Sequence, residues 1–149
     1  MGIGSEPAWL KVWERLMVTH AEVIRRLEAD LLAQHKISLT LFDVMSVLER
    51  APEHRIRMHK LADAVLITRS GLTRVADQLE EQGFVVRVRS TEDRRTVWLT
   101  LTEAGHQKLR EVWPDHRESI YLYFGQYLDA QDAEAIREAT EKVFRNYHE

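Results

Sequence analysis

The sequence predicts a mainly α-helical chain that carries one small β-hairpin. Apolar residues recur at helical spacing over most of the 149 residues. Strand-forming residues gather in one place, between residues 84 and 100, on either side of a short polar segment. Ahead of that place, two short helical stripes are separated by a tight turn. We therefore expect a helical chain in which a pair of short helices leads into the hairpin.

The first helix is expected to begin at Pro7, because proline suits the first helical position, and to run to about Gln34. Its apolar stripe is wider than a small core can cover. The stripe consists of Trp9, Trp13, Leu16, His20, Ile24, Leu27 and Leu31. Either the C-terminal helices or a second subunit must cover this face. The two tryptophans favour a second subunit, because large aromatic residues often anchor interfaces.

For the second helix, Thr40 is the expected N-cap, with Asp43 three residues later as its capping-box partner. The inward side chains share one apolar face and are Phe42, Val44, Met45, Val47 and Leu48. The segment 51–53, which contains Pro52, ends this helix.

The next two helices form the short pair. The first is expected over Met58–Val65, and Leu66 with Ile67 makes the turn. Thr68 is the expected N-cap of the second, because its hydroxyl can accept from N–H groups of the first turn. The second helix is expected from Arg69 to about Gln82, with an apolar stripe of Leu72, Val75, Ala76 and Leu79. Gly83 follows as a typical residue after a helix end.

Two strands follow, over residues 84–89 and 96–100, and residues 90–95 form a polar tip between them. A tight helix pair followed by a β-hairpin is a winged helix-turn-helix, with the hairpin as the wing. This is the fold class that the sequence predicts, flanked by N- and C-terminal helices.

After the hairpin, Thr102 should cap a long helix that starts at Glu103. Its predicted buried side consists of Leu109, Val112, Trp113, Ile120 and Phe124. Pro114 lies inside this helix and predicts a kink, which is either a hinge or a simple bend. Asp129, with Asp132, should cap the last helix. We expect one compact subunit in three parts: residues 1–36 and 103–149 for dimerisation, and residues 37–102 for the winged helix-turn-helix.

Several polar side chains on this frame suit double-stranded DNA. Arg69, Ser70, Thr73 and Arg74 lie off the apolar stripe of the second helix of the pair. Guanidinium and hydroxyl groups near a helix N-terminus are common contacts to base edges and phosphates. At the hairpin tip, Arg94 and Arg95 lie beside Asp93, which can hold an arginine or the loop itself. Taken alone, the charged tip is typical of a solvent-exposed hairpin. Its position next to the helix pair favours DNA binding instead.

The charge distribution agrees with this interpretation. The net charge is −3, which is unusual for a DNA-binding protein. However, residues 50–95 hold ten Lys and Arg against seven Asp and Glu, whereas the rest of the chain holds eleven against seventeen. A basic middle between acidic arms fits a DNA-binding face on a separate helical body.

On these residues the chain resembles the MarR family of bacterial transcription regulators. The resemblance rests on five stretches: Leu61-Ala62, residues 68–74, residues 79–85, Asp93-Arg94-Arg95 and Leu101-Thr102-Glu103-Ala104-Gly105. The wing signature of that family, Asp-x-Arg, five residues, Leu-Thr, is filled without a gap. Leu66 departs from the small or polar residue that the family often has in the turn.

The resemblance implies a homodimeric, cytoplasmic transcriptional repressor that binds a pseudo-palindromic DNA operator through Thr68, Arg69, Ser70, Thr73, Arg74, Asp93, Arg94 and Arg95. It also implies a short third strand over residues 55–57 beside the wing. A small, often aromatic, effector ligand is a further implication. Its expected pocket is lined by Trp13, Met17, His20, Phe42, Met45 and Trp113, although these residues also suit an ordinary core and interface.

Other classes have weaker support. Cysteine is absent, so disulfides and thiolate metal sites are excluded, and no apolar run approaches the roughly 20 residues of a membrane span. The sequence has no phosphate-binding glycine loop and no nucleophile or zinc-protease motif, so we expect neither an enzyme nor a cofactor. No two histidines have the i, i+4 spacing of a helical metal site, so a metal-responsive regulator requires residues brought together by the fold. The remaining alternative is a winged helix that binds protein and not DNA.

Overall fold

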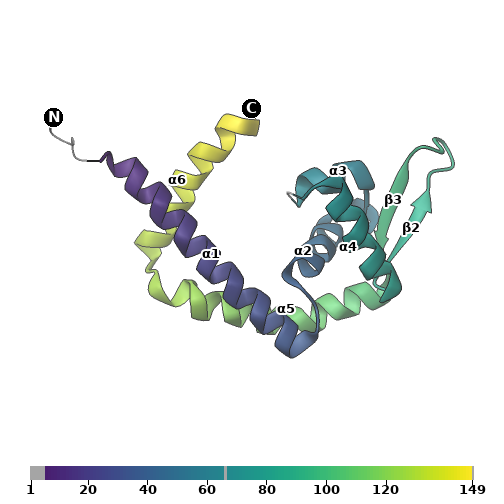
Figure 1. Cartoon of the computed structure of the whole chain (residues 1–149), viewed down its shortest axis with the longest axis horizontal. Coiled ribbons are helices and arrows are strands. Elements are labelled where there is room, and N and C mark those ends of the chain that lie inside the picture. The colour runs from purple at the N-terminus through teal and green to yellow at the C-terminus, as the bar shows by residue number, and fades with distance from the viewer. Residues whose placement is uncertain (1–5, 66, 149) are drawn as a thin grey trace. The chain divides into compact units, whose positions relative to one another are not determined.

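The structure is a computed structural model that describes residues 6–65 and 67–148, and Figure 1 labels its elements. The elements in chain order are α1 (Ala8–His35), α2 (Leu39–Arg50), the 3-10 turn η1 (Pro52–His54), β1 (Arg55–Arg57), α3 (Met58–Ala64), α4 (Arg69–Glu81), β2 (Val85–Arg89), β3 (Val97–Leu101), α5 (Glu103–Tyr123), the 3-10 turn η2 (Gly125–Tyr127) and α6 (Ala130–His148). The predicted mainly helical fold with a small β-hairpin is confirmed. Among the described residues, no single helix has both the length and the apolar character to cross a membrane, although α1 and α2 together, sharply bent, meet that test by length and composition.

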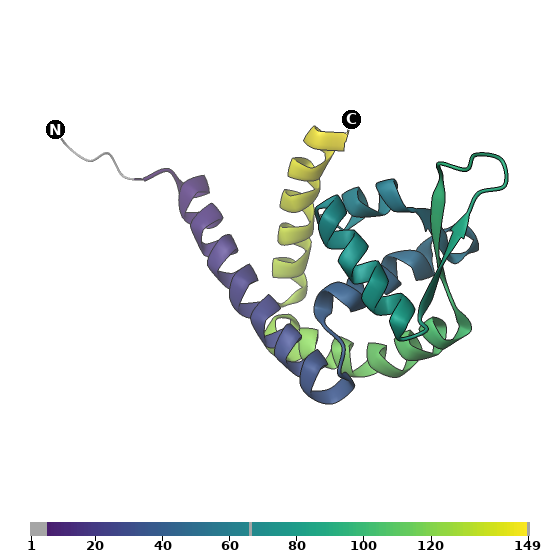
Figure 2. The same cartoon turned by 45° about the vertical axis from the view of Figure 1, so that its right-hand side comes forward.

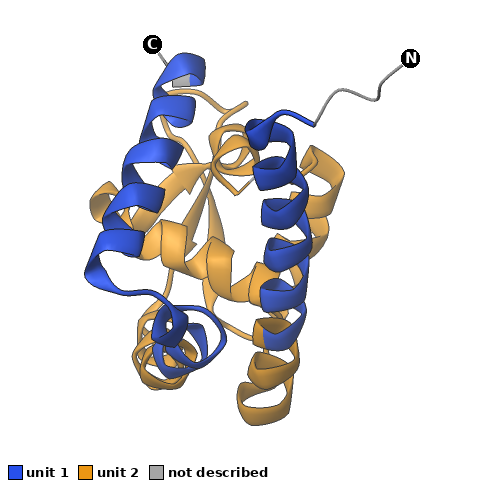
Figure 3. Cartoon of the chain, turned by 90° about the vertical axis from the view of Figure 1, so that its left-hand side faces the viewer, with its two compact units in different colours: residues 1–26, 117–149 blue, residues 27–116 orange. Residues whose placement is uncertain are grey.

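The chain forms two compact units, which Figure 3 colours separately. Unit 1 comprises residues 1–26 and 117–149, and unit 2 comprises residues 27–116. The boundaries therefore fall inside α1 and inside α5, between His116 and Arg117, shortly after Pro114. Unit 2 contains the whole winged helix-turn-helix.

The core of unit 2 is built on the predicted stripes. Leu72, Ala76 and Leu79 of α4 are buried, as are Leu61 and Ala62 of α3. The fully buried side chains from the neighbouring elements are Leu31, Ile37, Val44, Met45, Leu48, Val85, Leu99 and Val112. Aliphatic side chains so enclosed fix α4 against α2 and α3, since each buried side chain stabilises the packed state by about 1.5–3 kcal/mol.

The wing is a three-stranded antiparallel sheet in the order β1-β3-β2. The third strand over residues 55–57 is thereby confirmed: Arg57 lies opposite Trp98, and Val88 lies opposite the same tryptophan on the other side. Residues directly opposite one another share a face of the sheet. Leu99 and Val85 face the core, and the second face carries Arg55, Arg57, Trp98, Val86 and Val88.

The N-cap of α2 was predicted wrongly. The helix begins at Leu39, and its N-cap is Ser38, whose hydroxyl accepts from the Leu41 N–H at 3.2 Å. The Glu28 carboxylate of α1 accepts from the Leu39 N–H at 2.5 Å, so a side chain from another helix satisfies a further N–H group of this first turn. Two capping residues two positions apart cannot be ranked by sequence, and the tertiary contact with Glu28 accompanies the earlier start.

The other predicted helix ends are confirmed. Thr102 accepts from the Gly105 N–H at 3.1 Å at the start of α5. Asp129 and Asp132 cap α6 reciprocally, through backbone N–H groups at 2.8 and 3.3 Å. Gly83 follows α4 with a φ of 76°, a conformation that glycine adopts without steric cost. The turn residue Leu66 lies outside the described residues.

Two large side chains, Trp113 of α5 and Phe124 directly after it, are not buried as predicted. Trp113 is 50% exposed, Phe124 is 39% exposed and Ile120 is half-buried, whereas Leu109 and Val112 of the same face are buried. A helical period places residues on one side of a helix, but it does not tell whether that side is covered by the same chain.

Within unit 1, α1 and α6 leave much of their apolar surface uncovered. Trp9 is 70% exposed and Trp13 is 56% exposed. The other exposed apolar side chains of these two helices in unit 1 include Val12, Leu16, Met17, Val18, Ile136, Val143 and Tyr147. So large a group of exposed apolar side chains is uncommon on a monomer and is typical of an interaction surface.

Candidate nucleic-acid interface

The first turn of α4 is organised by Thr68. Its hydroxyl accepts from the Gly71 N–H at 3.0 Å, as the sequence predicted for an N-cap, and lies 3.2 Å from the Ser70 hydroxyl. Thr73 donates its hydroxyl proton to the carbonyl of Arg69 at 3.0 Å, so this hydroxyl retains only acceptor capacity toward a ligand. The exposed first turn therefore presents hydroxyl groups beside the positive end of the helix dipole.

Four guanidinium groups on α4 and on the wing tip remain available. Arg69 and Arg74 are exposed on α4, and Arg94 and Arg95 are exposed at the tip. Within the part of the chain that the structure describes, no carboxylate lies in ion-pair distance of any of the four. Unpaired arginines can neutralise phosphates without first breaking an internal ion pair.

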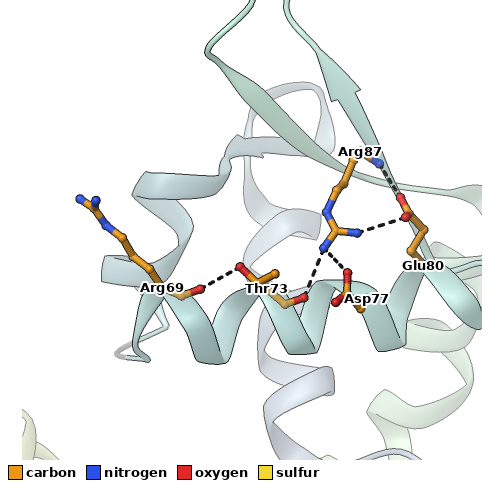
Figure 4. Close-up of polar contacts among 5 residues, drawn as sticks. All are labelled: Arg69, Thr73, Asp77, Glu80 and Arg87. Carbon is orange, nitrogen blue, oxygen red and sulfur yellow. Dashed lines mark hydrogen bonds and ion pairs between the residues drawn. The ribbon is translucent and has the colours of Figure 1, made fainter.

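Arg87 on β2 behaves differently, as Figure 4 shows. Its guanidinium donates to the Asp77 carboxylate at 2.6 Å, to the Glu80 carboxylate at 3.1 Å and to the carbonyl of Thr73 at 3.2 Å. Glu80 also accepts from the backbone N–H of Arg87 at 3.0 Å. Arg87 therefore ties the wing strand to the outer face of α4, and we name Arg87, Asp77 and Glu80 the wing clamp.

Sequence reasoning missed the wing clamp. It counted Arg87 only as one of the ten Lys and Arg of residues 50–95 and assigned no partner to Asp77 or Glu80. The pair spans seven positions from a helix to a strand, a spacing that periodicity does not connect. The available signal was charge: α4 carries acidic residues one turn apart, and the strand that returns beside it carries an arginine.

The wing tip, which extends beyond the helices of unit 2 in Figure 2, is shaped by Asp93. The Asp93 carboxylate accepts from the Arg95 N–H and from the Thr96 hydroxyl, each at 3.0 Å. These two hydrogen bonds, the first above all, lower the pKa of the Asp93 carboxyl below its ordinary value, so that it stays ionised near neutral pH. Of the two roles weighed for Asp93, the structure has it hold the loop, which leaves the arginine side chains unpaired.

The outward face of the sheet adds an aromatic element. The guanidinium groups of Arg55 and Arg57 lie 4.8 and 5.2 Å from the ring centroid of Trp98. Arginine at these distances is attracted to the indole face. Arg55 is also paired with Glu53 at 2.5 Å, so its charge is partly neutralised.

The residues predicted to line an effector pocket divide between the two units. Trp13, Met17 and His20 belong to unit 1, whereas Phe42, Met45 and Trp113 belong to unit 2. Within unit 2 the rings of Phe42 and Trp113 are nearly parallel, with centroids 6.3 Å apart, and Met45 is completely buried. Beside Trp113 there is a cavity of about 390 Å³, lined by Ser46, Glu49, Arg50, Leu109, Arg110, Trp113 and Pro114. Of the predicted set, only Trp113 lines it.

Comparison with known proteins places this geometry in a family. Residues 37–97 match the MarR family model. Over 107 residues the chain is 35% identical to the transcriptional repressor MprA of Escherichia coli K12; the match covers 72% of this chain and 60% of MprA. The chain thus spans about three fifths of that relative's length.

Solved structures agree in fold. The MarR family regulator Sco3205 of Streptomyces coelicolor, solved in complex with DNA, matches with a TM-score of 0.85 at 24% identity, over 96% of this chain and 92% of that one. BpsR of Bordetella bronchiseptica, whose DNA binding is regulated by 6-hydroxynicotinic acid, matches with a TM-score of 0.77 at 20% identity, over 89% and 98%. The helix pair, the wing with its Asp93-x-Arg95 signature and the family match together show that residues 37–97 form a domain of the MarR family of winged helix-turn-helix transcriptional regulators.

Proposed function

We propose that the chain is a homodimeric repressor that binds double-stranded DNA in a sequence-specific manner. α4 inserts into the major groove, and the wing tip reaches the flanking minor groove. The observation that carries the proposal is the set of four exposed, unpaired guanidinium groups, Arg69, Arg74, Arg94 and Arg95, on the two elements that the wing clamp holds together. Thr68, Ser70 and Thr73 add hydroxyl groups at the same helix end, and Asp93 fixes the loop that bears the wing arginines.

The test measures binding to DNA directly. A site is first selected from a random duplex library, and fluorescence anisotropy then gives its affinity. Arg74→Ala and Arg95→Ala should each weaken binding by about 5- to 150-fold, since a base or phosphate contact contributes about 1–3 kcal/mol. The matched control is Arg137→Ala, because Arg137 lies on α6 and is already paired with Glu134. Wild-type affinity in both test variants would remove these residues from the interface.

Salt dependence provides a second, independent readout. The logarithm of the affinity should fall linearly with the logarithm of salt concentration, by about 0.9 for each phosphate neutralised. Arg94→Ala should reduce that slope by about one while it weakens all sequences alike. A slope near zero for the wild type would contradict DNA binding as a whole.

The homodimer is proposed from unit 1. Trp9, Trp13 and Val143 are each more than half exposed in the single chain, and burying such side chains is the main favourable contribution to subunit association. Two recognition helices related by two-fold symmetry would read half-sites about 10 base pairs apart, so the operator is pseudo-palindromic.

Sedimentation velocity tests this assembly. Trp13→Glu and Val143→Glu should shift a dimer to a monomer at micromolar concentration, because each places a charge in an apolar interface. Val86→Glu is the control, since Val86 is 43% exposed but lies on the wing. A wild-type chain that sediments as a monomer refutes the proposal.

The control also separates a second candidate function. Val86 and Val88 form a small exposed apolar pair on the outward face of the sheet, which is the feature expected of a wing that binds protein. If the protein is such a module, Val86→Glu abolishes its interaction and Arg74→Ala leaves it intact. If the protein is a DNA-binding regulator, Arg74→Ala is the variant that loses binding.

We further propose that a small aromatic ligand relieves DNA binding from the cavity beside Trp113. Its volume of about 390 Å³ suits a ligand of one or two rings, and Arg50 supplies positive charge for a carboxylate, whereas Arg110 is already paired with Glu103. A thermal-shift screen with aromatic acids, 6-hydroxynicotinic acid included, should find compounds that raise Tm in the wild type and not in Trp113→Ala. No shift with any of them removes this class of effector.

A further inference from the structure

Three metal-ligating side chains, none of them among the residues proposed to contact DNA, meet in unit 2. Glu49 lies in the last turn of α2, His54 lies in η1, and His106 lies in the first turn of α5. One ligand atom from each lies within 4.8 Å of the other two. The Nδ1 atom of His106 is hydrogen-bonded to the Glu49 carboxylate, and the rings of His54 and His106 meet edge to face with centroids 4.5 Å apart.

The His54 ring makes a hydrogen bond of a kind that metal-binding histidines commonly make. Its Nδ1 atom lies 2.8 Å from the backbone carbonyl oxygen of Glu49. A carbonyl only accepts hydrogen bonds, so Nδ1 carries the proton and Nε2 keeps its lone pair. Histidines that bind metals nearly always donate their other ring N–H to a carbonyl or carboxylate in this way.

The backbone also holds His54 in an unfavourable conformation. Glu53 and His54 have φ values of 55° and 53°, in the left-handed region, which is unfavourable for a residue with a side chain. Strain of this kind persists where the surrounding structure enforces it, and it is often found at functional sites.

An ion pair between Glu49 and His106 alone does not account for the position of His54 beside them. An ion pair requires only one imidazole, and a second imidazolium beside it would be repelled. The exposures also suit a site that a cation enters from solvent: the His106 side chain is 15% exposed and anchors the cluster, whereas the Glu49 and His54 side chains are 41% and 48% exposed.

We propose that Glu49, His54 and His106 bind one divalent transition-metal ion, for which Zn²⁺ is the best match. Two imidazole nitrogens and one carboxylate oxygen are a frequent zinc ligand set, with water in the fourth position. The set contains too few oxygens for Ca²⁺ or Mg²⁺. In a tetrahedral site with bonds of about 2.0–2.2 Å, ligand atoms lie about 3.4 Å apart, so rotation of the exposed Glu49 and His54 side chains must close the remaining distance.

The bound ion would join three segments of unit 2. It would connect the end of α2 to the start of α5 through η1, the turn that leads directly into β1 of the wing sheet. Because the ion binds the folded state alone, it should stabilise unit 2 against unfolding. This inference does not depend on DNA binding, and its failure would leave the proposed function untouched.

The experiment uses the full chain without an affinity tag, stripped of metal with a chelator and dialysed. Zn²⁺ affinity and stoichiometry are measured by competition with a chromogenic chelator. We expect one Zn²⁺ per chain and a rise in Tm of about 5–10 °C at a hundredfold excess over Kd. Co²⁺ should give visible absorption bands of a tetrahedral site.

Substitutions then locate the site. His54→Ala, His106→Gln and Glu49→Gln should each weaken Zn²⁺ binding by at least about tenfold. His59→Ala is the matched control, because His59 is an exposed histidine of α3 outside the cluster, and it should bind as the wild type does. Circular dichroism confirms that each variant is folded, and Glu49→Gln keeps the size of the side chain. The proposal is overturned if the wild type shows no saturable binding below about 100 μM, or if binding survives all three substitutions.

Discussion

Replacement of Arg87 by methionine should separate stability from DNA affinity at the proposed interface. Methionine keeps most of the length and apolar contact of the arginine stem but removes the guanidinium of the wing clamp. Three side-chain hydrogen bonds are lost, two to carboxylates and one to the carbonyl of Thr73. Asp77 and Glu80 then face each other across the vacated position without a cation between them.

The magnitude follows from exposure. The Arg87 side chain is 25% exposed, whereas Asp77 and Glu80 are 56% and 43% exposed, so both carboxylates can regain water. We therefore assign each ion pair about 0.5–1 kcal/mol, in the range of solvent-exposed pairs, and the hydrogen bond to the carbonyl about 1 kcal/mol. The variant should lose about 2–3 kcal/mol of unfolding free energy, which lowers Tm by about 5–10 °C for a chain of this size.

Urea unfolding at one fixed protein concentration measures the loss, and Arg74→Ala is the matched control. Arg74 lies exposed on the same helix without an ion pair among the described residues, so its removal should change stability by less than about 0.5 kcal/mol while it weakens DNA binding. A double-mutant cycle of Arg87→Met with Asp77→Asn isolates the pairwise contribution. If Arg87→Met unfolds at the wild-type urea concentration, the wing clamp does not hold the wing to α4.

Three further predictions concern stability. Gly105→Ala should lower the unfolding free energy by about 1–3 kcal/mol in urea titrations, because its new Cβ would lie 2.3 Å from the carbonyl oxygen of Phe84. Unchanged stability would mean that the start of α5 can move away from Phe84. Ser38→Ala should cost about 0.5–2 kcal/mol by the same measurement, whereas Thr40→Ala should cost less, and the reverse order would restore Thr40 as the cap. Burial lowers the pKa of His116 below its ordinary value of 6.5, so the unfolded chain binds the proton more readily than the folded chain. The free energy of unfolding should therefore fall as the pH drops through 6.5, and it should stop falling once the pH is below the pKa of the folded state. His116→Phe should reduce that fall, which thermal unfolding at about pH 7 and pH 5 would show; identical pH dependence in both proteins would contradict the assignment.

Local patterns predicted the winged helix-turn-helix well. The stripe of α4, its Thr68 cap and the glycine after its end are signals within one element, and each lies where it was expected. The wing tip with its signature Asp93-x-Arg95 could be predicted equally well, because the conformation of a short turn is determined by the residues inside it. Such features depend on neighbouring residues along the chain, so they can be predicted without knowledge of the tertiary structure.

Contacts between distant segments could not be predicted. Arg87 meets Asp77 and Glu80 only because the chain reverses at Gly83 at a particular angle. His54 and His106 are 52 positions apart and were compared with other histidines nearer in sequence. Periodicity likewise marked Trp113 as buried, because an apolar residue on an apolar face has the same pattern whether its cover comes from its own chain or from elsewhere.

The position of Trp98 gives the protein an internal optical probe. Indole emission responds to the electric field of nearby charges, and here two guanidinium groups lie about 5 Å from the ring. A polyanion that approaches the wing would draw those cations away from the indole and change its quantum yield. The difference between the wild type and Trp98→Phe during a titration with duplex therefore reports wing engagement in solution without any label.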